Sequence, residues 1–167
     1  MDLPPSPWVV RWALQIRPGG EVLDLACGAG RHARWLSRMG FEVEAVDRDT
    51  GSFLDPPASV KLLQADLEAG PWPYPYRRFD GIIVTNYLHR PLLPILVDSL
   101  QPGGILVYET FALGNERFGK PSNPVFLLQP GELLEAVRGR LAVVAYEERV
   151  VDEPRPAAVQ RLCARGG

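Results

Sequence analysis

The chain has 167 residues, 46% hydrophobic and 23% charged, which is typical of one globular domain. Its net charge of −2 argues against binding nucleic acid by long-range attraction, although a local basic patch stays open. There is no apolar run of membrane-spanning length and no signal-peptide pattern, and Cys27 and Cys163 lack metal-ligand spacing. We expect a reduced cytoplasmic protein with no metal site and no membrane contact, as a monomer or homodimer.

Short apolar segments alternate with helical patterns along the chain, and glycine or proline separates them. The predicted elements, in chain order, are a helix over 8–16, a strand over 21–27, a helix over 31–39, strands over 41–47, 60–65 and 79–85, a helix over 91–100, a strand over 105–110, a helix over 130–137, and a closing hairpin of 141–146 with 159–163. This order predicts an α/β fold with a Rossmann-like, doubly wound, mostly parallel sheet and a C-terminal antiparallel hairpin.

We interpret residues 1–167 as a single domain. It divides into an N-terminal helix region (1–20), a core (21–111), a loop that is a candidate lid (112–129), and a C-terminal helix and hairpin (130–167). In a doubly wound sheet the ligand crevice lies at the carboxyl ends of the strands, so the residues at those ends are the candidates for a site.

The end of the first predicted strand is a glycine turn containing Gly28 and Gly30, a pattern that also suits NAD, FAD or a plain tight turn. The third glycine of the dinucleotide fingerprint is absent. Asp24 lies inside the first strand, while Asp47 and Asp66 end the second and third. A row of carboxylates is unfavourable for a pyrophosphate and favourable for a cationic nucleoside such as S-adenosylmethionine.

The segments VLDLACGAGRHARWL, EAVDRD and LLQADLE, followed by FDGIIVTNYLH and LQPGGILVYET, resemble in order and spacing the motifs of class I S-adenosylmethionine-dependent methyltransferases. The tail FLLQPGELLEAV resembles the branch that includes tellurite-resistance and related small-molecule methyltransferases. In one departure, the segment after Asp47 is too short for the full helix that usually covers the adenine.

The resemblance implies a cofactor site for S-adenosylmethionine, with S-adenosylhomocysteine as product. Asp24 would orient the turn or reach the ammonium group, Asp47 would hold the ribose hydroxyls, and Asp66 with Leu67 would meet the adenine edge. The cofactor-binding residues that it implies are Asp24, Ala26, Gly28, Gly30, Asp47, Arg48, Asp66, Leu67 and Asn86.

Three residues are candidates for catalysis. Asn86 would sit nearest the sulfonium, His89 is a candidate base or substrate-orienting group, and Glu109 is a candidate substrate contact. The competing interpretations are that His89 caps the next helix and that Glu109 forms a salt bridge. We interpret the Cys27 thiol as inert packing.

These observations predict an S-adenosylmethionine-dependent methyltransferase acting on a small nucleophile that the sequence does not identify. Two alternatives stay open: an RNA or protein methyltransferase that works with a recognition partner, and a non-catalytic S-adenosylmethionine-binding module. Arg31, Arg34 and Arg38 follow helical spacing on one face, which we interpret as a solvated stripe.

Overall fold

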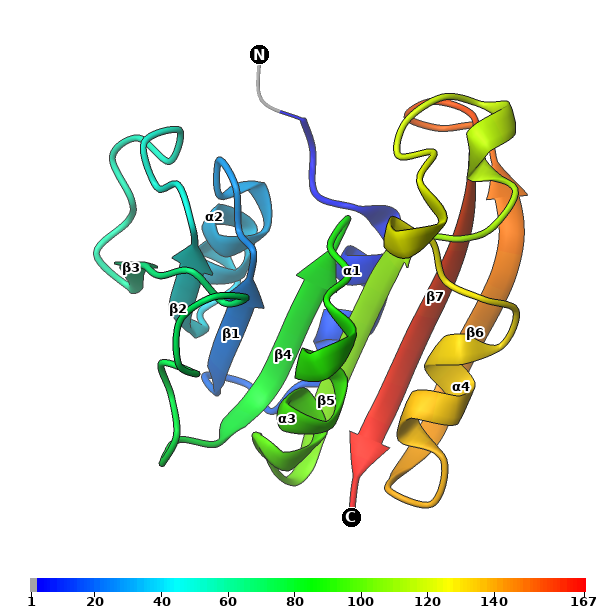
Figure 1. The fold of residues 1–167 in the computed structure, drawn as a ribbon. Coiled ribbons are helices and arrows are strands. Elements are labelled where there is room, and N and C mark those ends of the chain that lie inside the picture. Colours follow the sequence, from blue (N-terminus) through cyan, green and yellow to red (C-terminus); the bar gives the residue numbers. More distant parts are fainter. Residues whose placement is uncertain (1–2) are drawn as a thin grey trace.

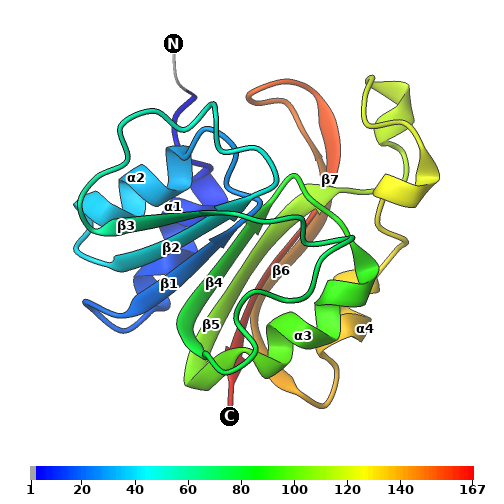
Figure 2. The same ribbon diagram turned by 60° about the vertical axis from the view of Figure 1, so that its left-hand side comes forward.

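The computed structural model describes residues 3–167 as a single seven-stranded sheet with helices on both faces (Figures 1 and 2). The strands are β1 (Glu21–Leu25), β2 (Glu42–Asp47), β3 (Val60–Gln64), β4 (Phe79–Thr85), β5 (Leu100–Phe111), β6 (Leu141–Val151) and β7 (Ala157–Gly166), in the spatial order β3-β2-β1-β4-β5-β7-β6. The first five strands are parallel, and β7 runs antiparallel to both β5 and β6. The predicted fold class is confirmed.

Residues 3–167 also contain four α-helices and four 3-10 helices, of which α1 and η1 precede the first strand. They are α1 (Pro7–Trp12), η1 (Ala13–Gln15), α2 (Arg31–Arg38), η2 (Arg90–Leu92), α3 (Leu93–Asp98), η3 (Asn115–Arg117), η4 (Pro124–Phe126) and α4 (Glu132–Val137). Helices α1 and α2 cover one face of the sheet, while α3 and α4 cover the other (Figure 2). No helix in this part of the chain combines the length and the apolar character needed to cross a membrane.

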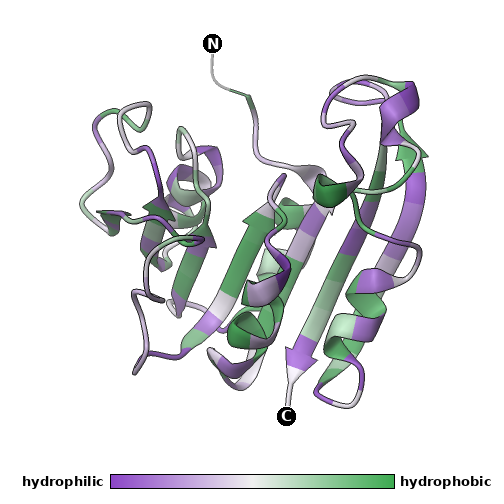
Figure 3. Cartoon of the chain, viewed as in Figure 1, coloured by the Kyte–Doolittle hydropathy of each residue, from purple (hydrophilic) through white to green (hydrophobic). Residues whose placement is uncertain are grey.

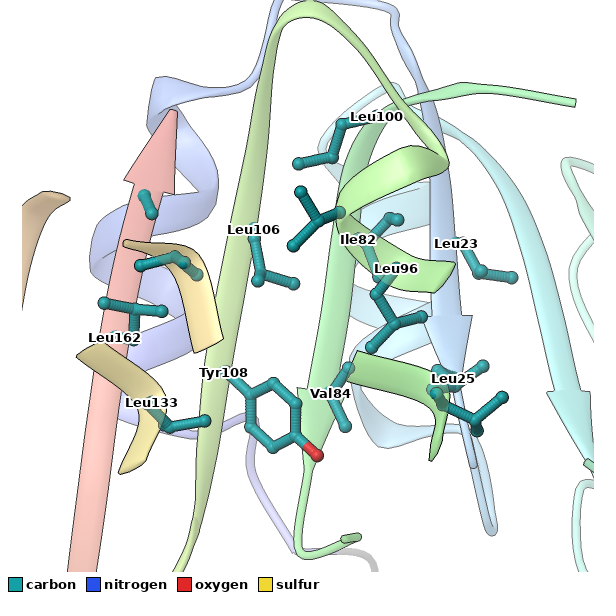
Figure 4. Close-up of a cluster of buried hydrophobic side chains, with 14 of the residues drawn as sticks. Leu23, Leu25, Ile82, Val84, Leu96, Leu100, Leu106, Tyr108, Leu133 and Leu162 are labelled. Carbon is teal, nitrogen blue, oxygen red and sulfur yellow. The ribbon is translucent and has the colours of Figure 1, made fainter. Parts of the chain in front are cut away.

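Each face of the sheet has its own hydrophobic core, because strands covered on both sides bury successive side chains in opposite directions. On β5, Leu106 and Tyr108 join the core under α3 and α4, shown in Figure 4, whereas Ile105 and Val107 join the core under α1 and α2. The central strand β4 is accordingly apolar along most of its length (Figure 3).

Several element boundaries differ from the sequence-based expectation. Strand β5 begins at Leu100 instead of the predicted residue 105, because residues 101–104 form a bulge between the pairs Phe79–Leu100 and Gly81–Ile105. Strands β6 and β7 are longer than predicted. Strand β6 continues through the polar residues Glu147, Glu148 and Arg149, which apolar patterning did not include, and β7 runs from Ala157 to Gly166. The segment 112–129 contains η3 and η4 and one bridge, Ala112 to Leu128.

The topology places a ligand crevice between β1 and β4. The chain runs outward from β1 through β2 to β3, then returns to place β4 on the other side of β1. The connections leaving β1 and β4 therefore diverge, which opens a space at the carboxyl ends of the two strands. In Figure 1 these ends point upward, toward the N-terminal segment.

Candidate functional site

The turn after β1 is built on residues with positive φ: Ala26 (56°), Gly28 (54°) and Gly30 (88°). A Cβ on Gly28 would meet no atom within 4 Å, so this backbone is open to a ligand. A Cβ on Gly30 would lie 2.3 Å from Cε2 of Phe53, so this glycine is required by packing. The Gly28 N–H donates to Oδ2 of Asp47 at 2.9 Å, which ties the turn to the end of β2.

Carboxylates hold the turns after β2 and β3 through short-range hydrogen bonds. Oδ1 of Asp47 accepts from the backbone N–H of Asp49 at 2.9 Å. Oδ1 of Asp66 accepts from the N–H groups of Ala69 at 3.0 Å and Glu68 at 2.9 Å, and these bonds lower the pKa of Asp66. Asp66 therefore stays ionised at neutral pH, and both carboxylates have oxygen lone pairs left over for a ligand.

Three hollows meet along the carboxyl ends of the strands. The β2 hollow, of about 180 Å³, is lined by Ala26, Asp47, Arg48, Ala65, Asp66, Leu67, Glu68 and Tyr87. The α2 hollow, of about 760 Å³, is lined by Leu3, Pro4, Pro5, Ala26, Cys27, Gly28, Ala29, Arg31, His32, Arg34, Arg38, Thr85 and Asn86. The β5 hollow, of about 350 Å³, is lined by Glu68, Asn86, Tyr87, Leu88, Thr110, Phe111, Pro121 and Phe126.

Shared residues join the three hollows into one groove. Ala26 belongs to the β2 and α2 hollows, Asn86 to the α2 and β5 hollows, and Tyr87 to the β2 and β5 hollows. A further hollow of about 490 Å³ beside α4, which includes Arg90 and Glu132, contains none of the predicted site residues. The groove, and not the hollow beside α4, is therefore the candidate site.

The groove has opposite charges at its two ends. The β2 hollow contains three carboxylates and one arginine, while the α2 hollow contains three arginines and no carboxylate. Arg31, Arg34 and Arg38, interpreted from the sequence as a solvated stripe, all line the groove, and Arg38 remains exposed there. Arg31 Nη1 donates to the carbonyl of Pro4 at 3.0 Å, which holds the N-terminal segment over this end.

His32 is a site residue that the sequence analysis missed. It is 3% exposed, and its Nε2 accepts the backbone N–H of Ser6 at 3.0 Å. Its Nδ1 lies 3.4 Å from Oγ1 of Thr85. Burial lowers the pKa of His32 to about 3, so the ring is neutral and its one proton is on Nδ1, facing Thr85.

The three catalytic candidates occupy different environments. Asn86, at φ 53°, lines the groove where the α2 and β5 hollows meet. Nδ1 of His89 lies 3.4 Å from Oε1 of Glu68, and His89 lines none of the three hollows. Glu109 is 8% exposed, accepts from Oγ of Ser6 at 2.7 Å and forms an ion pair with Arg161. Of the three, Asn86 alone lines the groove.

Two polar groups lie at the interior end of the turn. Asp24 is 1% exposed, and its Oδ2 has no hydrogen-bond partner. Burial raises the pKa of Asp24 to about 7, against the opposing effects of the Ala33 backbone and the charge of Arg31. Burial also raises the pKa of the Cys27 thiol, which leaves it protonated and a poor nucleophile.

Comparison with known proteins identifies the family. A family model described as a methyltransferase domain matches residues 22–104. The ribosomal protein L11 methyltransferase of Thermus thermophilus is 33% identical over 101 residues, which cover 55% of this chain and 39% of that protein. The protein-L-isoaspartate O-methyltransferase of Chlorobaculum tepidum is 32% identical over 109 residues, which cover 60% of this chain and 49% of that protein.

Solved structures share the fold at lower identity. TehB from Haemophilus influenzae superposes with a TM-score of 0.78 at 21% identity, covering 95% of this chain and 61% of that one. The 1,6-didemethyltoxoflavin-N1-methyltransferase of Burkholderia thailandensis superposes with a TM-score of 0.71 at 18% identity, covering 96% of this chain and 76% of that one. The chain spans less than half the length of the two curated relatives. The chain therefore contains a methyltransferase domain over residues 22–104, and its strand order is that of the class I methyltransferase fold.

Proposed function

We propose that this chain binds S-adenosylmethionine along the groove and transfers its methyl group to a small nucleophile in the β5 hollow. The bound cofactor supplies a methyl group already activated by a sulfonium. The observation that carries the proposal is the separation of charge along the groove, with carboxylates at one end and arginines at the other. This arrangement complements a ligand with hydroxyl groups and a base at one end and an amino-acid carboxylate at the other.

The β2 hollow is proposed to hold the nucleoside. Each Asp47 oxygen already accepts one backbone N–H, which fixes the carboxylate and leaves further lone pairs for the two ribose hydroxyls. Asp66 and Leu67 line the same hollow and would face the adenine, with Arg48 at its rim. This assignment keeps the roles that the family resemblance implies for these residues.

The α2 hollow is proposed to hold the methionine part. Gly28 leaves space against the backbone, and Gly30 shapes the turn that opens the N-terminus of α2. The positive end of this eight-residue helix, together with Arg31, would attract the cofactor carboxylate. Asp24 lines none of the hollows, so we assign it to supporting the turn from beneath.

Asn86 is proposed to lie nearest the reacting atoms, since it lines both the α2 and the β5 hollow. Alignment of nucleophile, methyl and sulfur would then supply most of the rate enhancement. Glu109 and His89 are proposed as positioning residues, because the first binds Ser6 and Arg161 and the second contacts Glu68.

A small acceptor is favoured over a macromolecule by the size of the β5 hollow, about 350 Å³, which suits one small molecule. The methyltransferase of Burkholderia thailandensis, which shares the fold, is named for a small heterocyclic acceptor. The two curated relatives are named for protein acceptors, but this chain covers less than half of each. The proposal of a small acceptor therefore rests on the size of the β5 hollow and not on the curated relatives.

The test is calorimetric titration with S-adenosylhomocysteine, and with NAD as the competing ligand. We expect binding of the first and none of the second. Asp47→Ala should weaken S-adenosylhomocysteine binding by about 10- to 100-fold, the range for a lost hydrogen bond to a charged group. Asp49→Ala is the matched control, because Asp49 lies two residues away and outside the three hollows. Absence of any affinity for S-adenosylhomocysteine would overturn the proposal.

A further inference from the structure

Within the groove, the β5 hollow borders both of the hollows that are proposed to hold the cofactor. It shares Asn86 with the α2 hollow, and it shares Glu68 and Tyr87 with the β2 hollow. If the proposed function holds, a cofactor lying across the β2 and α2 hollows passes beside this space. The chemistry of the β5 hollow then selects the acceptor.

The walls of the β5 hollow are mostly apolar and aromatic. Tyr87, Phe111 and Phe126 contribute three aromatic rings, and Leu88 and Pro121 contribute aliphatic surface. Aromatic walls bind flat aromatic molecules by offset stacking and edge contacts, which favour a planar partner beyond simple area burial. A volume of about 350 Å³ limits the acceptor to one small ring system.

The charge in the β5 hollow has a single sign. Glu68 is its one acidic residue, and neither lysine, arginine nor histidine is among the eight residues that line it. The Tyr87 hydroxyl donates to Oε2 of Glu68 at 3.3 Å, while burial and the nearby Glu68 carboxylate raise the pKa of Tyr87 and keep its phenol protonated. This environment repels carboxylate and phosphate acceptors and stabilises positive charge that develops on an acceptor.

The walls contributed by the loop after β5 are fixed in place. Arg90 donates to the carbonyls of Val125 at 2.8 Å and Leu127 at 2.9 Å, on either side of Phe126. Asn115, 1% exposed, donates from Nδ2 to the carbonyl of Pro121 at 3.0 Å. The predicted lid segment therefore contributes an anchored wall, and an anchored wall can discriminate between shapes.

We propose that the acceptor is a neutral, planar aromatic amine or nitrogen heterocycle, bound against Phe111 and Phe126 with its nitrogen directed toward Asn86. Such a nitrogen attacks with its own lone pair, so no base is needed before the methyl group moves. The nitrogen–carbon bond forms as the carbon–sulfur bond breaks with its electron pair on sulfur. The positive charge passes to nitrogen, beside Glu68. An amine nitrogen then loses a proton to water, whereas a pyridine-type ring nitrogen has no proton to lose and keeps the charge.

The experiment measures binding of three probes to the protein saturated with S-adenosylhomocysteine, by saturation-transfer nuclear magnetic resonance. The probes are 6-aminoquinoline, quinoline-6-carboxylate of the same shape with a negative charge, and cyclohexylamine, which is cationic and not planar. We expect 6-aminoquinoline to bind at least about ten-fold more tightly than either of the others, since like charge and lost stacking each weaken binding. Phe126→Ala should weaken the binding of 6-aminoquinoline about ten-fold, because one stacking partner is lost.

Val125→Ala is the matched control. Val125 lies in the same 3-10 helix as Phe126 and is 63% exposed, but it lines the hollow beside α4 instead of the β5 hollow. Glu68→Gln should reduce the discrimination against quinoline-6-carboxylate. Equal binding of the three probes, or binding of none, would overturn the inference. The proposed function would still stand in that case, provided that the protein binds S-adenosylhomocysteine. Transfer of labelled methyl groups to bulk protein or RNA, with no probe bound, would also overturn it.

Discussion

The two ends of the groove are built in different ways. At the β2 end, the Asp47 and Asp66 carboxylates accept backbone N–H groups two or three residues ahead, and Asp47 also accepts the N–H of Gly28, 19 residues back. At the α2 end, Ser6 binds His32, 26 residues away, and Glu109, 103 residues away. The α2 end therefore exists only when the N-terminal segment, α2 and β5 are packed together.

This difference predicts how the two ends respond to mutation. Changes at the β2 end should alter ligand affinity with less effect on folding, because Asp66 is exposed, Asp47 is half-buried, and most of their hydrogen bonds are local. Changes at the α2 end should alter the free energy of unfolding as well, because its polar groups are buried and their partners are distant.

The largest effect that we expect at the α2 end concerns Asp24. Because its pKa rises from 3.8 in the unfolded chain to about 7 in the fold, the native state holds a proton that the unfolded state has lost between these values. Its stabilising contribution is complete below pH 3.8 and is lost as the pH rises through 7. Asp24→Asn cannot ionise, so it should be more stable than the parent at pH 8 by up to about 4 kcal/mol.

Urea unfolding from pH 4 to pH 8 measures this effect, and Asp80→Asn is the control with the opposite sign. Burial alone would raise the pKa of Asp80, but its hydrogen bond to Arg17 and the backbone of Glu21 lower the pKa overall. Asp80→Asn should therefore lose stability at pH 8 relative to the parent. A parallel pH dependence for the parent and Asp24→Asn would show that Asp24 is ionised in the folded protein.

The two glycines of the turn after β1 have different roles: Gly30 is required by packing against Phe53, and Gly28 leaves space for a ligand. Gly30→Ala should lower the free energy of unfolding by about 2–4 kcal/mol, because the added Cβ overlaps the Phe53 ring and φ is 88°. Gly28→Ala has a similar φ of 54° but open space, so it should cost about 1–2 kcal/mol.

Urea unfolding and S-adenosylhomocysteine titration on both variants check this pair. In Gly28→Ala we expect the loss of affinity to exceed the loss of stability, since the added methyl group enters the α2 hollow. If Gly28→Ala bound the ligand as tightly as the parent, the methionine part would not lie against this turn.

The elements that could be predicted well from the sequence are those that local patterns determine. Strands β1 and β4 are apolar on both faces, Gly28 and Gly30 follow β1 directly, and Asp47 ends β2, so the sheet and the β2 end of the groove could be placed without a structure. Each of these signals lies within a few residues of the feature that it specifies.

The features that sequence missed depend on distant partners. His32 is an ordinary helical position until Ser6 is folded over it, and Arg31 lines the groove because it binds the carbonyl of Pro4. Glu109 was a candidate for a substrate contact or a salt bridge, and its partner Arg161, 52 residues further along the chain, could not be named from the sequence. No local pattern records these pairings, because Ser6 and Pro4 reach α2 only in the folded chain and Glu109 meets Arg161 only when β5 and β7 align.

The smallest effect that we expect is at the contact which closes the α2 end. Oγ of Ser6 donates to Glu109 and accepts the backbone N–H of Trp8 at 3.2 Å, where it caps α1. Ser6→Ala should lower the free energy of unfolding by about 1 kcal/mol through loss of the cap. It should also weaken the binding of S-adenosylhomocysteine about five-fold, because a less firmly held N-terminal segment covers the α2 hollow for less of the time.

The control is Ser52→Ala, since Ser52 is exposed and lies outside the three hollows. A loss of stability without any change in affinity would mean that Ser6 anchors α1 alone, and that the N-terminal segment does not take part in holding the ligand.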